Sequence, residues 1–248
     1  MLTQEQINHF QTFGFLTFRG LFSQDELKTI NTEFESAMTE AFRDDPFDGT
    51  RRHWLITMGP DTPFLASLLE DPRFCDAAEQ LYGEDVFGIA SDINRYVGDT
   101  RWHPDTGSLN QYGVKFAYYL QPVTAETGAL RLIPGSHEAS FHGELRKKMD
   151  GLELEIPDVP AYVFESEPGD VVAFDVRCWH ASWGGAVDRR MCVLVYYNNP
   201  KTPEEAEATQ KQIIGNRVDY GPWVANAEGH PKRQRWIDRM RELAPDAL

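Results

Sequence analysis

Apolar and polar residues near the N-terminus recur with the period of an α-helix. Thr3 followed by Gln6 has the pattern of a capping box and predicts a short amphipathic helix that stops at Gly14. A second capping box, Ser23 with Glu26, predicts the start of a longer helix. Its apolar positions have helical spacing: Leu27, Ile30, Phe34, Ala37, Met38 and Ala41. We expect this longer helix to cover one face of a sheet.

Short runs of β-branched and aromatic residues dominate the middle of the chain. Glycine, proline and aspartate separate these runs, which is typical of strands joined by tight turns. The predicted strands are residues 15–18, 86–90, 93–97, 114–120, 128–133, 161–164, 171–175 and 191–198. Many short strands without alternating helices favour a sandwich or barrel over a parallel sheet. The pattern therefore predicts a mainly β protein, a jelly-roll barrel with flanking helices.

The pattern becomes helical and charged again near the C-terminus. Residues 202–216 and 231–243 have this character, with Trp223 and Trp236 as apolar anchors. This tail either closes over the barrel or builds a dimer contact. We expect one domain over residues 1–248, with a helical part to about residue 84, a barrel core from about 85 to 200 and a helical tail from about 201.

Composition narrows the classes of partner. The chain of 248 residues has 24 basic and 39 acidic side chains, a net charge of −15, and no segment dominated by basic residues. This argues against nucleic acid and anionic membranes as partners. The three cysteines have no paired spacing, which argues against a disulfide framework and fits a reducing cytoplasm. The sequence contains no run of eighteen apolar residues, so it predicts no membrane-spanning helix.

A histidine and an aspartate two residues apart form the clearest candidate for a metal site. His103 and Asp105 point the same way on an extended backbone, so both can bind one ion. A second histidine, His180, follows the apolar run at residues 171–174. Two histidines and one carboxylate on one face of an octahedron are the ligands of non-haem Fe(II) oxygenases. Two alternatives remain: a zinc hydrolase with a carboxylate base, or a barrel that binds metal without catalysis.

Two arginines precede the last predicted strand. Arg189 and Arg190 lie directly before the β-type run at residues 191–197. A guanidinium beside a metal can pair with the far carboxylate of a dicarboxylic acid through two parallel hydrogen bonds. The sequence therefore favours a site for a cosubstrate such as 2-oxoglutarate.

These motifs together resemble the phytanoyl-CoA dioxygenase family of Fe(II)- and 2-oxoglutarate-dependent oxygenases. The likeness extends from residue 13 to about residue 198. The residues that carry it are His103, Asp105, the segments 128–137 and 167–170, His180 and Arg190. The resemblance implies a double-stranded β-helix of the cupin type and iron held by His103, Asp105 and His180.

The resemblance also implies a 2-oxoglutarate site. Arg190 would bind the distal carboxylate, with Ser182 as an additional hydroxyl donor. Family members commonly place this arginine one residue further from the second histidine, so Arg189 remains an alternative. The cofactors implied are Fe(II), 2-oxoglutarate as cosubstrate, O2, and ascorbate as a reductant.

The expected reaction is hydroxylation of an unactivated C–H bond of a small metabolite or natural-product intermediate, with release of succinate and CO2. Family members that halogenate replace the aspartate by a small residue, so Asp105 disfavours halogenation. Desaturation and ring chemistry stay open, as does the choice between monomer and homodimer.

The loop at 44–53 is either an exposed charged segment or part of the substrate entrance, and His137 is expected to be structural. Candidates for the substrate site are Trp54, Tyr96, Trp102, Asn110, Tyr118, Arg131 and Trp183.

Overall fold

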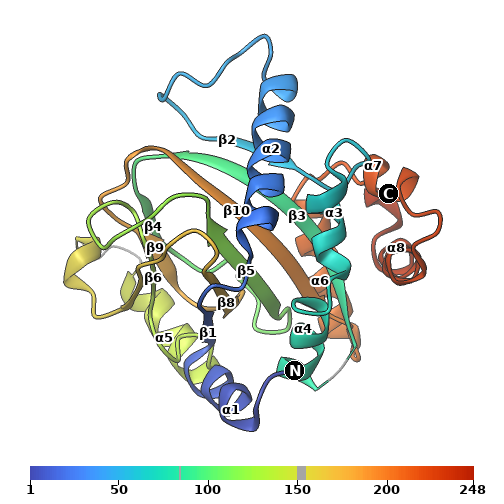
Figure 1. Ribbon diagram of the computed structural model, residues 1–248. Helices are drawn as coiled ribbons and strands as arrows, with labels where there is room; N and C mark the ends of the chain where they lie inside the picture. The colour runs from blue at the N-terminus through green and yellow to red at the C-terminus, as the bar shows by residue number, and fades with distance from the viewer. Residues whose placement is uncertain (84, 150–154) are drawn as a thin grey trace.

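Two antiparallel sheets and a set of covering helices make up the computed structural model, which describes residues 1–83, 85–149 and 155–248 (Figure 1). The strands are β1 (Phe15–Phe18), β2 (His53–Ile56), β3 (Val86–Val97), β4 (Thr100–His103), β5 (Gly113–Tyr119), β6 (Leu130–Leu132), β7 (Tyr162–Phe164), β8 (Val171–Asp175), β9 (His180–Ser182) and β10 (Val187–Asn198). The helices are α1 (Gln4–Phe13), α2 (Gln24–Ala41), α3 (Pro63–Ser67), α4 (Cys75–Tyr82), α5 (Ala139–Met149), α6 (Pro203–Gly215), α7 (Gly221–Ala225) and α8 (Pro231–Leu243).

The larger sheet has six strands in the order β1-β8-β5-β10-β3-β2, and the smaller has four in the order β4-β9-β6-β7. The jelly-roll prediction is confirmed at the level of the fold, although the two sheets do not close into a continuous barrel. Sequence analysis did not predict β2, β4 or β9. The predicted strands at 86–90 and 93–97 form one strand, β3.

Both faces of the larger sheet are buried, which explains why its strands appear as continuous apolar runs. On β5, Phe116 and Tyr118 pack on the side covered by helices, whereas Ala117 and Tyr119 belong to the core that faces the smaller sheet. Alternate residues of a strand point to opposite faces, so a run buried on both sides loses its alternation of apolar and polar residues. Lys115 is the exception on the inner face of β5.

Helix α2 covers the helix side of the larger sheet, as the sequence predicts (Figure 1). Both predicted capping boxes are present, at Thr3 for α1 and at Ser23 for α2. Glu35 on α2 forms ion pairs with Arg95 on β3 and Arg190 on β10. One carboxylate thus ties the helix to two neighbouring strands.

The C-terminal tail packs on the larger sheet, the first of the two arrangements expected for it. Trp236 of α8 is buried, with its ring centroid 6.1 Å from that of Tyr196 on β10. The six-membered ring of Trp236 lies where a Cβ at Gly88 would be, so this strand position needs a glycine. Among the described residues, no helix combines the length and apolar character needed to cross a membrane.

Candidate metal centre

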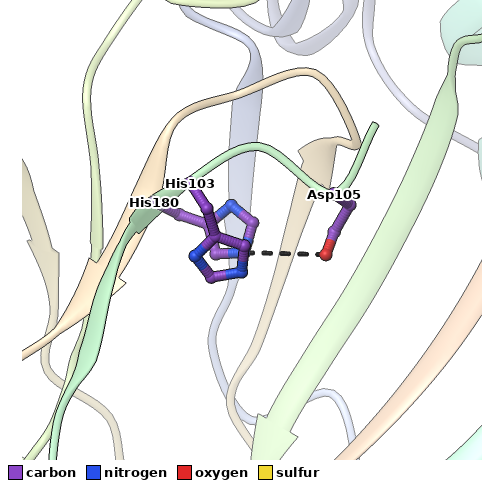
Figure 2. A group of neighbouring side chains, drawn as sticks. All are labelled: His103, Asp105 and His180. Carbon is purple, nitrogen blue, oxygen red and sulfur yellow. Dashed lines mark ion pairs between the residues drawn. The ribbon is translucent and has the colours of Figure 1, made fainter. Parts of the chain in front are cut away.

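His103 and His180 lie directly opposite each other where β4 pairs with β9. Their ring centroids are 4.3 Å apart. Asp105 follows the end of β4, and its backbone N–H donates to the carbonyl oxygen of Val176 at 2.9 Å. One ligand atom from each of the three side chains lies within 4.8 Å of the others (Figure 2). The fold therefore brings all three predicted ligands together, although 75 residues of sequence separate Asp105 from His180.

Backbone carbonyls orient both imidazoles. Nδ1 of His103 lies 2.7 Å from the oxygen of Arg101, and Nδ1 of His180 lies 2.9 Å from the oxygen of Cys178. A proton on each Nδ1 leaves Nε2 as the free lone pair, which is the arrangement that metal-bound histidines require. Burial lowers the pKa of His180 to about 4, so its imidazole is neutral at physiological pH.

Asp105 is held by a lysine that sequence analysis missed. Lys115 Nζ lies 2.7 Å from Asp105 Oδ2, while Oδ1 lies 3.7 Å from His180 Nε2. Burial alone would raise the pKa of Asp105, but Lys115 and the two histidines outweigh it and lower this pKa to about 2. The carboxylate is therefore ionised, with Oδ1 toward the histidines and Oδ2 toward the lysine. A single lysine within the apolar run at 114–120 was the available signal.

A cavity of about 140 Å³ adjoins the three ligands and contains Arg189. The Arg189 side chain is buried, and its Nη2 donates to Ser182 Oγ at 2.9 Å. Its Nε has no hydrogen-bond partner among the described residues. A Cβ at Gly128 or Gly185 would meet this guanidinium, so both glycines make room for it. A buried cation with an unused donor, next to the Ser182 hydroxyl, suits a carboxylate ligand.

Arg190, which the sequence favoured as the residue that binds the distal carboxylate of 2-oxoglutarate, points away from the cavity. Its Nη1 donates to Asn31 Oδ1 and lies near Glu35 Oε1, both at 3.1 Å and both on α2. Adjacent residues of a strand face opposite sides, so only one of the two arginines can reach the cavity. Arg189 faces the candidate metal ligands and Arg190 faces the helix, so the geometry favours Arg189, the alternative that the sequence left open.

A second cavity of about 300 Å³ shares a wall with the first, formed in part by Asp105 and Lys115. Of the predicted substrate residues, Trp54 and Tyr96 line it, and Tyr96 lines both cavities. Gln212 of helix α6 and Asn216, which caps the end of that helix, close one side.

The other five candidates line neither cavity. Tyr118 is on the helix side of the sheet, 4.8 Å between ring centroids from Phe22. Arg131 donates to the backbone and lies 5.8 Å from the Trp183 ring, so these two residues pair with each other. Asn110 lines a separate surface pocket beside α6. Trp102 lines neither cavity.

His137 is not a ligand in this arrangement. Its Nε2 lies 3.2 Å from the carbonyl oxygen of Gln11 on α1, and the side chain is buried beside Gly14. This contact holds the N-terminal helix against the turn after β6, in agreement with a structural role. The donor set of two imidazoles and one carboxylate fits Fe(II) and would leave coordination positions for other ligands.

Comparisons with known proteins agree with this geometry. The family model described as phytanoyl-CoA dioxygenase matches residues 10–191. The ectoine dioxygenase of Bordetella bronchiseptica is 24% identical over 217 residues, which cover 73% of this chain and 70% of that protein.

Solved structures share the fold. HygX from Streptomyces hygroscopicus, with nickel and 2-oxoglutarate bound, has a TM-score of 0.65 at 19% identity and covers 83% of this chain and 94% of its own. EctD from S. alaskensis, with 2-oxoglutarate and 5-hydroxyectoine, has a TM-score of 0.59 at 20% identity and covers 79% of this chain and 76% of its own.

Proposed function

Because this chain belongs to the phytanoyl-CoA dioxygenase family of Fe(II)- and 2-oxoglutarate-dependent oxygenases, we propose that it hydroxylates an unactivated C–H bond of a small metabolite or natural-product intermediate. Succinate and CO2 would be released with the product. The relatives named ectoine dioxygenase support a small-molecule substrate.

The observation that carries the proposal is the convergence of the donor set and a buried guanidinium at one cavity. His103, Asp105 and His180 would hold Fe(II), and Arg189 with Ser182 would bind the distal carboxylate of 2-oxoglutarate. When bound, Fe(II) and 2-oxoglutarate would supply the electrons that activate O2 for oxidation of the substrate. The protein holds the ligands in their protonation states, orients the cosubstrate and restricts access of water.

Each side chain has a definite task. The carbonyls of Arg101 and Cys178 keep the lone pair of each imidazole Nε2 directed at the metal position. Lys115 holds Asp105 Oδ2, so that Oδ1 is the oxygen available as a single-atom ligand. Ser182 Oγ accepts from Arg189 and from the backbone N–H of Thr100 at 3.2 Å, so its own proton remains available for a carboxylate.

Release of succinate tests the proposal. Purified protein is incubated with Fe(II), ascorbate and 2-oxoglutarate, and succinate is measured with and without candidate substrates. We expect slow uncoupled turnover that the substrate stimulates. Asp105→Ala should abolish succinate formation while the circular dichroism spectrum stays that of the folded protein. Wild-type turnover in this variant would contradict the ligand assignment, and hydrolytic activity with zinc alone would favour the hydrolase instead.

A further inference from the structure

The second cavity has a buried carboxylate on its wall. Asp92 on β3 is 7% exposed and faces the cavity together with Asn94 and Tyr96, since alternate residues of β3 share one face. Ile89, Val193 and Val195 contribute apolar surface to the same cavity. The volume of about 300 Å³ is at the lower end of the range for ligand pockets and suits a small molecule.

Among the residues that the structure describes, the Asp92 carboxylate receives a hydrogen bond from an uncharged donor. Asn94 Nδ2 donates to Asp92 Oδ1 at 2.7 Å. The Asn94 amide oxygen accepts from Arg52 Nε at 2.9 Å, which fixes which end of the amide faces Asp92. No ion pair within 4 Å involves Asp92 in the part of the chain that the structure describes. A buried carboxylate without a cation is costly, so this position suits a positively charged ligand group.

Neither of the two cations that line the cavity, Arg52 and Lys115, forms an ion pair with Asp92. Lys115 Nζ pairs with Asp105 Oδ2 at 2.7 Å. Arg52 donates to Asn94, and its Cζ lies 4.4 Å from the centroid of the Tyr96 ring. The wall formed by α6 offers the neutral amides of Gln212 and Asn216. Asp92 therefore has no cation in direct contact among the described side chains, and Arg52 reaches it only through the Asn94 amide.

We propose that the second cavity binds the substrate and that Asp92 pairs with a cationic nitrogen of that substrate, an ammonium or amidinium group. This inference rests on the proposed function, and it assigns the substrate class. Burial raises the pKa of Asp92 to about 6 against the opposing effects of Lys115, Asn94 and Arg52, so the carboxylate is largely ionised above neutral pH and can form this pair. An anionic or wholly apolar substrate would leave the carboxylate without a partner.

Three ring compounds of similar size test the proposal: cyclohexylammonium, cyclohexanol and cyclohexanecarboxylate. Each is titrated at pH 8 into protein loaded with Fe(II) and 2-oxoglutarate under nitrogen, and binding is followed by calorimetry. We expect the cation to bind at least about tenfold more tightly than the alcohol and the carboxylate. Equal binding of all three, or tightest binding of the carboxylate, would overturn the proposal.

Asp92→Asn isolates the charge, because asparagine keeps the size and can still accept from Asn94. The preference for cyclohexylammonium over cyclohexanol should fall to less than about twofold in this variant. Asp61→Asn is the matched control, because Asp61 is exposed and lines neither cavity, and it should keep the wild-type preference. An unchanged preference in Asp92→Asn would overturn the proposal.

A second variant covers the case in which Asp92→Asn does not fold. Ala90→Leu adds bulk to the wall of the second cavity, and Ala90 does not line the first. We expect it to weaken cyclohexylammonium binding at least tenfold, and unchanged binding would overturn the cavity assignment.

Failure of the proposed function would be distinguished by a different measurement. It would appear as no succinate from the wild-type protein with any substrate, whereas the charge preference is measured without turnover.

Discussion

Neighbouring arginines on β10 differ in role because successive residues of a strand point to opposite faces. Arg189 lies in the cavity beside the metal ligands, whereas Arg190 joins Asn31 and Glu35 on α2. Arg189→Ala should raise the dissociation constant for 2-oxoglutarate at least about tenfold, as expected for a lost charge-assisted pair worth roughly 1.5 to 3 kcal/mol. Anaerobic titration of the Fe(II)-loaded protein measures this effect.

Arg190→Ala is the matched comparison. Its ion pair with Glu35 is partly exposed, so its loss should lower the free energy of unfolding by less than about 1 kcal/mol and change 2-oxoglutarate affinity less than twofold. The opposite result, with Arg190→Ala the damaging change, would show that the two side chains have been assigned to the wrong faces.

Asp92 should make the stability of the ligand-free protein depend on pH. Burial raises its pKa from 3.8 to about 6, so the folded state disfavours ionisation between these values. The loss of stability that ionised Asp92 causes is absent below about pH 4, grows between about pH 4 and 6, and is complete above that window. Asp92→Asn should therefore unfold at the same urea concentration as wild type at pH 4, yet be more stable by roughly 1 to 3 kcal/mol at pH 8. A constant difference across pH would contradict this.

The sequence was informative about single residues where a short motif carries the chemistry. His103 and Asp105 are close in sequence, and His180 follows a predicted strand. Lys115 and Asp92 were not predicted as site residues, because only the assembled sheets show that they face the cavities. The choice between Arg189 and Arg190 stayed open in the sequence for a related reason. Every residue from 191 to 197 is apolar, so the strand does not reveal its inner face.

At the scale of elements, sequence patterns predicted the long helices and strands and missed the strands that carry the ligands. β4 has four residues and β9 has three, which is too short for a clear period of apolar residues. These strands form by pairing with each other and with β6. β10 also begins with an irregularity between Val187 and Arg189, where Asp188 has a φ of 63°. Such a bulge shifts the register of the strand, and the position of the bulge cannot be predicted from the composition of the turn alone.

Gly128 links the turn before β6 to Arg189, the residue proposed to bind 2-oxoglutarate. Its φ is +97°, and an added Cβ would collide with Arg189 Nη1. Gly128→Ala should move the guanidinium, raise the dissociation constant for 2-oxoglutarate several-fold and cost about 1 kcal/mol or more of stability. Gly143→Ala in α5 is the control, since nothing lies within 4 Å of its Cβ, and it should leave both quantities within error or slightly improve stability. Equal effects of the two substitutions would contradict the role of Gly128.

For the whole molecule, metal and cosubstrate should stabilise the folded state. The three ligands come from β4, the segment after it and β9, so a metal ion joins separate parts of the chain. At concentrations about 100 times the dissociation constant, binding contributes roughly 2.7 kcal/mol. Fe(II) under nitrogen should raise the melting temperature, with a further rise on adding 2-oxoglutarate, and a chelator should reverse both. Asp105→Ala should lose most of the metal effect, and a full effect in this variant would argue for a different ion site.

The second cavity is completed by a part of the chain that the family model does not match. Gln212, Asn216 and Val218 line it, whereas the match ends at residue 191. Gln212 Nε2 also donates to the backbone oxygen of Asp105 at 3.1 Å. Most of the cavity wall, Asp92 included, comes from residues inside the match. A change confined to the C-terminal stretch would therefore reshape one side of the cavity while Asp92 and the candidate metal ligands stay in place.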